Sequence, residues 1–205
     1  PKTRLVNQAA CKSNRDIIAM HDADVLFKPQ AIQALVTAFR QNRNCHYGLP
    51  YDGVFLDVNE PTKSRLTDSW DFGCIPQVAA GVLYREYAPG VICVNPVSVG
   101  GANYFRRETF LKLGGFNEKF VSCIWEDYEI EARFTKMGFP AAIIGDANAY
   151  HLHHTRVSDE ETQRYNLINR KEYEKVCGMD QKTLERYIQE ELLPNLQKSQ
   201  ERIPK

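Results

Sequence analysis

Asp22 and Asp24 are two carboxylates at alternate positions, directly after a short apolar segment at residues 16–20. Such a segment is typical of a buried parallel strand. Ligands of open α/β sheets bind at the carboxyl ends of strands, where paired carboxylates can hold a hard divalent cation such as Mg²⁺ or Mn²⁺. Asp-x-Asp is also common in surface turns, so the pair predicts a metal site only together with other groups.

A second cluster of potential ligands, His151, His153 and His154, follows an apolar run at residues 140–144 that predicts a strand. Imidazole nitrogen is a common ligand of transition metals and suits Mn²⁺ better than Mg²⁺. His151 and His154 are three residues apart and could share one side of a turn. A polar turn with satisfied histidines, or a zinc site that combines the histidines with Asp24, remains an alternative.

The third group is Trp125-Glu126-Asp127, at the start of a helix predicted over residues 126–137. Carboxylates are ordinary residues in a first helical turn, because the helix dipole stabilises them. A carboxylate that faces a pocket could instead act as a general base toward a hydroxyl group. Trp125 would then offer a flat apolar face to a sugar ring, although packing in the core explains most tryptophans.

These groups need a scaffold, and the sequence predicts one in which strands and helices alternate. Predicted strands lie at residues 16–20, 91–94 and 140–144; predicted helices end near residue 10, begin at Pro29, and span residues 106–113, 126–137 and 181–193. A further charged helix begins with a capping-box pattern at residues 158–161. Residues 41–90 are predicted to be irregular, with aromatic side chains that either line a site or fill a core. This alternation is typical of an α/β fold with helices on the faces of a sheet.

Composition narrows the function further. The chain has 205 residues, of which 43% are hydrophobic and 25% charged, as in a single globular domain. Lys+Arg and Asp+Glu number 26 each, so the basic excess typical of a nucleic-acid partner is missing. We expect no transmembrane segment, because no apolar run of about 18 residues occurs. The six cysteines are scattered and no N-x-S/T sequon occurs, which favours reduced thiols and a cytoplasmic location, although the even count leaves disulfides open.

The order of the three groups resembles that in the GT-A fold glycosyltransferases. The shared order is a strand with Asp-x-Asp, then Gly100-Gly101 with a short helix ending in Leu-Gly-Gly-Phe, then Trp-Glu-Asp, then a late histidine. The chain looks most like the bacterial family 2 enzymes and the animal β-1,4-galactosyltransferases, and a related pattern occurs in the polypeptide N-acetylgalactosaminyltransferases. The similarity covers about residues 2–156, and residues 100–138 are its most specific part.

The resemblance implies a fold and a division of the chain. We expect a Rossmann-like mixed sheet with helices on both faces, a catalytic part at residues 1–157 and a helical extension of the same domain at 158–205. The first strands of the family, which hold the nucleotide base, precede the Asp-x-Asp motif. Only 21 residues precede that motif here, so we expect a fragment that lacks those strands.

The resemblance also implies roles for individual residues. The metal ligands would be Asp24 and His154, with His151 at the position of a methionine ligand in the galactosyltransferases. The residues assigned to the nucleotide and donor sugar are Lys2, Arg4, Asn7, Asp22, Gly100 and Gly101. Asp127 would be the general base, with Glu126 beside it near the acceptor. Trp125, which replaces a glycine of the family, would contact the acceptor.

The expected activity is that of an inverting glycosyltransferase that requires Mn²⁺ or Mg²⁺. It would move a sugar from a UDP-sugar to a hydroxyl of a glycan acceptor, as in the synthesis of bacterial surface polysaccharide, in the cytoplasm or peripherally at the inner membrane. Two other functions stay open. One is a non-catalytic carbohydrate- or nucleotide-binding module, and the other is a metal-dependent hydrolase of sugar nucleotides that uses water as the acceptor.

Overall fold

The computed structural model describes residues 2–79, 83–121, 125–155 and 160–201. Its helices are α1 (Lys2–Lys12), α2 (Pro29–Gln41), α3 (Thr62–Ser69), α4 (Arg107–Lys112), α5 (Glu126–Lys136), α6 (Glu160–Gly178), α7 (Gln181–Tyr187) and α8 (Leu193–Glu201), with a 3₁₀ turn η1 (Phe72–Cys74) and a π-helical segment η2 (Ile188–Leu192). Its strands are β1 (Ile17–His21), β2 (Val25–Leu26), β3 (Tyr47–Leu49), β4 (Phe55–Val58), β5 (Glu86–Ala88), β6 (Val91–Asn95), β7 (Ala102–Arg106), β8 (Ala142–Ile143) and β9 (Ala149–Leu152).

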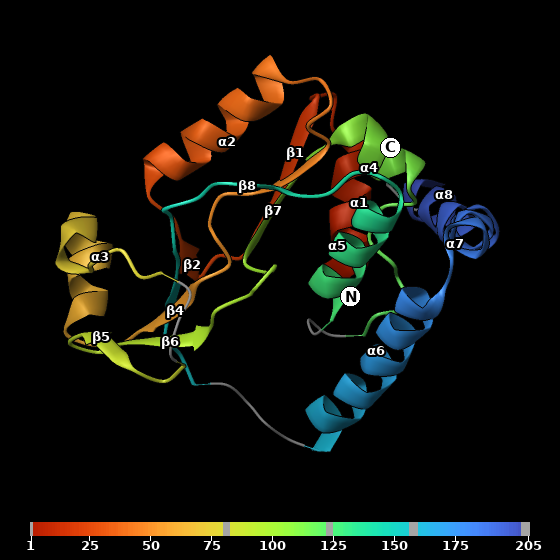
Figure 1. Ribbon diagram of the computed structural model, residues 1–205. Helices are drawn as coiled ribbons and strands as arrows, with labels where there is room; N and C mark the ends of the chain where they lie inside the picture. The colour runs from red at the N-terminus through yellow and green to blue at the C-terminus, as the bar shows by residue number, and fades with distance from the viewer. Residues whose placement is uncertain (1, 80–82, 122–124, 156–159, 202–205) are drawn as a thin grey trace.

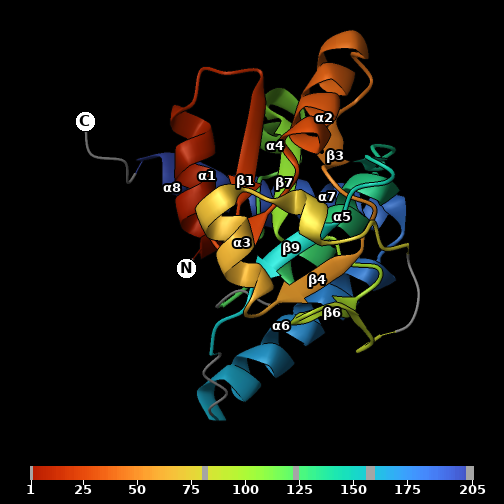
Figure 2. The same cartoon turned by 90° about the vertical axis from the view of Figure 1, so that its left-hand side faces the viewer.

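The described strands form two mixed sheets. One has the order β1-β7-β3-β8 and the other β2-β9-β4-β6-β5. The β3–β8 and β4–β9 pairs are parallel and the remaining pairs are antiparallel. Figures 1 and 2 show α2 on one side of β1 and β7 and α1 on the other. The predicted α/β class, with a mixed sheet and helices, is therefore confirmed.

The strand before Asp22 differs from the prediction in two respects. β1 pairs antiparallel with β7, from Ile17 opposite Arg106 to His21 opposite Ala102. Within the described residues β7 is its only strand partner, so β1 is an edge strand, and of its residues only Met20 is buried. The prediction of a buried parallel strand was wrong, because an apolar run does not reveal which neighbour the sheet supplies.

An aromatic core packs α5 against β7. Phe105 of β7 stacks on Tyr47 of β3 with ring centroids 5.1 Å apart, and it lies 5.3 Å from Phe134 of α5. Leu35 and Phe39 of α2 pack into the same core, and both are almost fully buried. The helices predicted from Pro29 and from residue 126 are therefore confirmed, and their apolar faces bury as the helical spacing indicates.

Residues 41–90 were predicted to be irregular, but their described part, 41–79 and 83–90, contains three strands, one helix and one 3₁₀ turn. β4 and β6 build a second, smaller core around Leu56, Val58 and Val91. The strands are so short that their alternation of apolar and polar residues does not stand out from the turn residues between them. Aromatic side chains divide between the two predicted roles, since Tyr47 and Tyr51 are fully buried whereas Trp70 is 61% exposed.

The histidine cluster also lies on an element that the sequence did not reveal. Residues 142–143 form β8 in the first sheet, whereas His151 belongs to β9 in the second sheet. The prediction of one strand leading into the histidines was wrong, because the chain turns at Asp146, which has a φ of 57°, and changes sheets.

The carboxyl-terminal helices share the main core through Leu184, Ile188 and Leu192. The helix predicted at residues 181–193 begins at Gln181 but continues through η2 and α8 to Glu201. The wider turn of η2 comes directly before Pro194, whose ring would clash with the carbonyl of Glu190 in a regular α-helix. Of the predicted capping pattern, residues 158 and 159 lie outside the described residues. Within the described ranges, none of the helices combines the length and apolar character that a membrane span requires.

Gly115 lies in a turn that has no room for a larger residue. Its φ is 67°, and a Cβ there would lie 2.4 Å from Oδ1 of Asn7. We predict that Gly115→Ala destabilises the protein by at least about 1 kcal/mol more than Gly138→Ala, as measured by urea unfolding. Gly138 is the matched control, because its φ is 86° but a Cβ there meets nothing within 4 Å. Equal losses in the two variants would contradict the predicted clash.

Candidate metal centre and carboxylate cluster

Backbone pairing in the second sheet places Asp24 beside the histidines. Asp22 and Asp24 lie in the turn between β1 and β2, and Val25 of β2 is opposite His151 of β9. The amide of Leu152 donates to the carbonyl of Asp24 at 2.8 Å. The strand pairing therefore brings the aspartate and histidine clusters together, although the two are well over a hundred residues apart in the chain.

Asp24, His151 and His154 form a group whose ligand atoms all lie within 4.8 Å of one another. Oδ2 of Asp24 is 2.9 Å from Nε2 of His154 and 3.5 Å from Nε2 of His151. The side chain of His151 is 5% exposed, whereas those of Asp24 and His154 are 41% and 49% exposed. Two imidazole nitrogens and one carboxylate oxygen are a donor set that fits a divalent transition metal, with one side open to solvent.

Asp57 of β4 is a member of this cluster that the sequence analysis missed. It lies opposite His151 in the parallel β4–β9 pair. Its Oδ1 is 2.6 Å from Nδ1 of His151, and its Oδ2 is 2.6 Å from Nδ1 of His153. Burial opposes the charged form, but the hydrogen bonds from the two histidines outweigh it and lower the pKa of Asp57. The sequence carried one signal for this residue: Asp57 lies between the apolar Leu56 and Val58, and such alternation is typical of a strand.

A second cluster of charges gathers around Lys2 at the start of α1. Its ammonium lies 3.0 Å from Oδ1 of Asp22 and 3.3 Å from Oε1 of Glu126, which is 2% exposed. Burial alone would lower the pKa of Lys2, but the surrounding carboxylates of Asp127, Asp22 and Glu126 outweigh it and raise that pKa. Lys2 therefore remains a cation and links the end of β1 to the first turn of α5.

Asp127 is the carboxylate with the most altered acidity in this cluster. Burial is the main cause that raises its pKa to about 8; the charge of Lys2 opposes the rise and that of Glu126 adds to it. The side-chain amide of Asn103 donates to Oδ1 of Asp127 at 3.0 Å, and the hydroxyl of Tyr47 donates to Oδ1 of Asn103 at 2.8 Å. Tyr47 thus fixes the orientation of the Asn103 amide, which in turn orients the Asp127 carboxylate.

Gly100 and Gly101 lie between the two clusters. The carbonyl of Gly101 accepts from the amide of Asp22 at 2.9 Å, and a Cβ on Gly100 would lie 2.9 Å from Oδ2 of Asp127. Gly101 has a φ of 81°, and the hydroxyl of Tyr51 donates to the carbonyl of Gly100 at 2.7 Å. Gly100 thus lets the backbone approach the Asp127 carboxylate, whereas Gly101 is buried and a Cβ there would lie 2.9 Å from the Phe55 ring.

Asn7 and Arg4, which were assigned to the nucleotide, bond to protein groups in the structure. Asn7 is fully buried. Its Nδ2 donates to the carbonyl of Phe116 and to Oε1 of Glu118, each at 2.9 Å, and its Oδ1 accepts from the amide of Phe116 at 2.8 Å. Arg4 donates to the other carboxylate oxygen of Glu118 at 3.3 Å. These contacts give Asn7 a part in joining α1 to the loop after α4, and its side chain is not accessible to a ligand.

Trp125 lies directly before α5 and leans on α6. Its φ is 76°, a conformation that favours glycine, which is the residue the resembling family has at this position. The indole stacks on Tyr173 with centroids 5.1 Å apart, and its Nε1 donates to Asn166 at 2.5 Å. One face of the ring is therefore covered by α6. A sugar could contact only the part of the indole that α6 leaves exposed.

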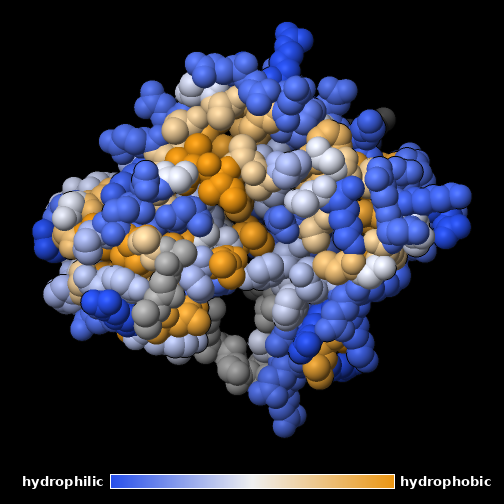
Figure 3. Space-filling view, viewed as in Figure 1, coloured by the Kyte–Doolittle hydropathy of each residue, from blue (hydrophilic) through white to orange (hydrophobic). Residues whose placement is uncertain are grey.

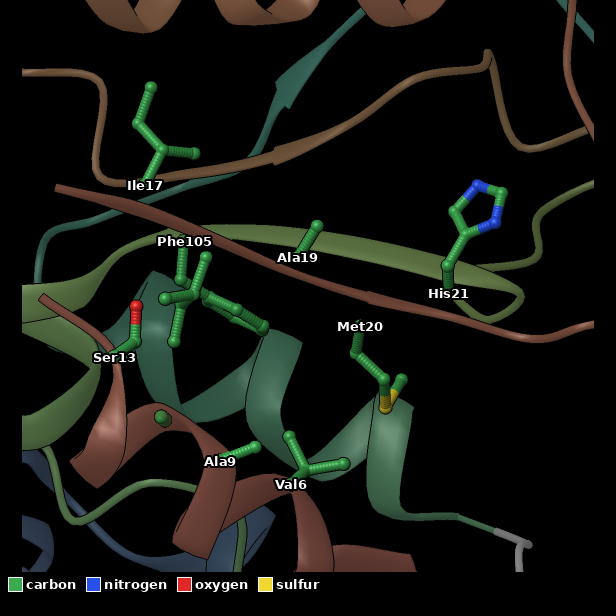
Figure 4. Close-up of a pocket in the computed structure, with 10 residues that line it drawn as sticks. Val6, Ala9, Ser13, Ile17, Ala19, Met20, His21 and Phe105 are labelled. Atoms are coloured by element: carbon green, nitrogen blue, oxygen red, sulfur yellow. The ribbon is translucent and has the colours of Figure 1, made fainter. Parts of the chain in front are cut away.

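Two hollows lie near these clusters. Figure 3 shows an open hollow between the β5–β6 side of the molecule and α6, and in the same view the start of α5 lies beside it. A separate groove of about 460 Å³ lies between α1 and β1 and is lined mainly by apolar side chains such as Val6, Met20 and Phe105. Figure 4 shows Met20 pointing toward α1 and His21 pointing to the opposite side of the strand. This groove lacks the charged groups of the two clusters.

Of the predicted site residues, the structure brings Lys2, Asp22, Glu126, Asp127, Gly100 and Gly101 into one region and Asp24, His151 and His154 into an adjoining one. Asp22 and Asp24 join the two regions, because they are separated by one residue. No protein-family model matches this chain, and no curated protein matches its sequence.

The raised pKa of Asp127 predicts a specific pH dependence of stability. An ordinary aspartate titrates near 3.8, so between about pH 4 and pH 8 the folded protein holds a proton that the unfolded chain lacks. The free energy of unfolding should therefore fall as pH rises through this range, and Asp127→Asn should abolish that part of the fall. We expect the difference between the two proteins to change by at least about 1 kcal/mol between pH 5 and pH 8.

Urea unfolding of both proteins across this range provides the measurement. Asp127→Asn retains an acceptor for Asn103, so the subtraction reports the titration of Asp127 together with its effect on the neighbouring Glu126. Parallel stability curves for the two proteins would show that Asp127 has an ordinary pKa.

Proposed function

We propose that this chain is the catalytic part of an inverting, metal-dependent glycosyltransferase of the GT-A type. It would move a sugar from a UDP-sugar to a hydroxyl of a glycan acceptor, as in the synthesis of bacterial surface polysaccharide. The observation that carries the proposal is the juxtaposition of a three-ligand centre at Asp24 with a carboxylate of raised pKa at Asp127, which lies against the glycine pair at residues 100 and 101.

The ligand set supports the donor half of this proposal. Asp24, His151 and His154 would hold Mn²⁺ or Mg²⁺, which when bound neutralises charge that develops on the leaving diphosphate. The partly exposed backbone of Gly100 lies next to Gly101, whose carbonyl bonds Asp22, and we assign the donor sugar to this side. Lys2, which is paired with Asp22, adds a positive charge on the same side.

Asp127 supports the acceptor half of the proposal. As a general base it must lose its own proton first, and then accept the proton of the attacking hydroxyl. A pKa of about 8 lies near a neutral operating pH, which is where a general base is most effective. A single base, with attack from the side opposite the leaving diphosphate, inverts the anomeric carbon. Asn103 holds the carboxylate in position.

Two alternatives use parts of the same geometry. A binding module would use the metal and aromatic groups without turnover, and it gives no reason for a half-buried carboxylate of raised pKa beside the glycine pair. A hydrolase of sugar nucleotides would use the same metal centre and base, with water in place of the glycan. The two enzymatic functions differ only in the acceptor, so product analysis separates them.

Release of UDP by the full-length protein, with Mn²⁺ and a panel of UDP-sugars, tests the proposal. We expect metal-dependent release from one donor, faster with an acceptor glycan, and a loss of at least about 100-fold in Asp24→Ala. Asp68→Ala is the matched control, because Asp68 is an exposed aspartate on α3. Release that does not respond to any glycan would favour the hydrolase, and no release from any donor would favour the binding module.

The pH profile of turnover tests the role of Asp127. At saturating donor, we expect the rate to rise with pH and level off above an apparent pKa of about 8, since only the ionised carboxylate accepts a proton. Asp127→Asn should lower kcat by about 10²–10⁴-fold and leave donor affinity unchanged. Lys2→Met should move the profile to higher pH, because the lysine charge lowers the pKa of Asp127. A profile without this rise would exclude Asp127 as the base.

A further inference from the structure

Asp57 connects the histidine cluster to the sheet through both of its carboxylate oxygens. Each oxygen is 2.6 Å from the Nδ1 atom of a different ring, one of His151 and the other of His153. The side chain of Asp57 is 17% exposed, and its backbone is fixed by the β4–β9 pairing opposite His151. The carboxylate is therefore held by strand geometry rather than by a mobile loop.

The Asp57 contact sets the proton positions on His151. An ionised carboxylate can only accept hydrogen bonds, so Nδ1 of His151 carries the proton, and in the neutral ring Nε2 presents its lone pair. That Nε2 lies 3.5 Å from Oδ2 of Asp24. The ring thus directs an electron-pair donor toward a carboxylate oxygen, and a cation between the two atoms would bind both.

His154 repeats this arrangement from the other side. Its Nδ1 is 3.2 Å from the carbonyl of Thr155, which also can only accept, so in the neutral ring Nε2 is again the acceptor. This Nε2 is 2.9 Å from the same Oδ2 of Asp24. Three electron-pair donors therefore converge on one point, and two of the three are oriented by hydrogen bonds on their far side. A divalent cation satisfies all three at once.

We propose that Asp57 is a positioning residue of this metal centre, which fixes the tautomer and orientation of His151 and so determines how tightly the centre binds Mn²⁺. Carboxylates that bond the second nitrogen of a ligating histidine typically change metal affinity by about 10–100-fold. His153, which is half exposed, occupies the second oxygen of Asp57 and remains outside the coordination sphere. The inference rests on the metal centre of the proposed function.

Titration with Mn²⁺ alone, followed by the electron paramagnetic resonance signal of the free ion, tests this role without a sugar substrate. We expect Asp57→Asn to raise the Kd for Mn²⁺ by about 10–100-fold. His151→Ala should raise the Kd at least as much. In the His151→Ala background, Asp57→Asn should change the Kd by less than about threefold, because its effect passes through His151.

Two controls separate positioning from a general effect on folding. His153→Ala should leave the Kd for Mn²⁺ within about threefold of the unmodified protein, since that ring is outside the coordination sphere. Asp52→Asn alters a comparable half-buried aspartate that bonds Asn148 instead of a histidine, and it should leave the Kd equally unchanged. Asp57→Ala takes the place of Asp57→Asn if circular dichroism shows that the asparagine variant does not fold.

The proposal is overturned if the Asp57 variant binds Mn²⁺ as the unmodified protein does, or if it loses the same factor with and without His151. Either result leaves the proposed transferase function intact, provided that the unmodified protein binds Mn²⁺ and releases UDP. Conversely, coupling between Asp57 and His151 in a protein that releases no UDP would support the positioning role and refute the transferase.

Discussion

The Lys2 ammonium is the charge on which the arrangement of the carboxylate cluster depends. Asp22 comes from the end of β1 and Glu126 from the first turn of α5, and both lie within 3.3 Å of the lysine. Without a cation between them, three carboxylates that include Asp127 would repel one another in a partly desolvated space. Burial of Asp127, together with the charges of Glu126 and Asp22, outweighs the effect of the lysine and raises the pKa of Asp127 to about 8.

The metal centre depends on a different constraint, the hydrogen bonding of the second sheet. Strand β9 lies between β2 and β4, so His151 faces Asp24 on one side and Asp57 on the other. The backbone of His151 is therefore held by the hydrogen bonds of a strand that is paired on both sides. His151 and Asp57 thus lie on paired strands, whereas Asp24 and His154 lie in the segments that adjoin those strands.

Some residues have a different role from the one that the sequence indicated, because a predicted site residue stabilises the fold and an unassigned residue belongs to the site. Asn7 was expected near the nucleotide, but its amide closes the turn after α4, where Gly115 leaves room for it. Asp57 lay in a segment expected to be irregular, yet it holds two histidines. In both cases the partner is roughly a hundred residues away, beyond any local pattern in the chain.

The sequence by itself determined the local elements and the chemical groups that they carry. Helical spacing after Pro29 located α2, and glycines at the carboxyl ends located α4 and α5, because these signals arise from residues close together in the chain. Only the tertiary structure decided that β1 is an edge strand, that His151 lies in the second sheet, and that Asp57 and Lys2 orient the two clusters. Such contacts form between strands and helices that are far apart in the chain. Residue types and their spacing within one segment do not reveal which distant segment will pair with it.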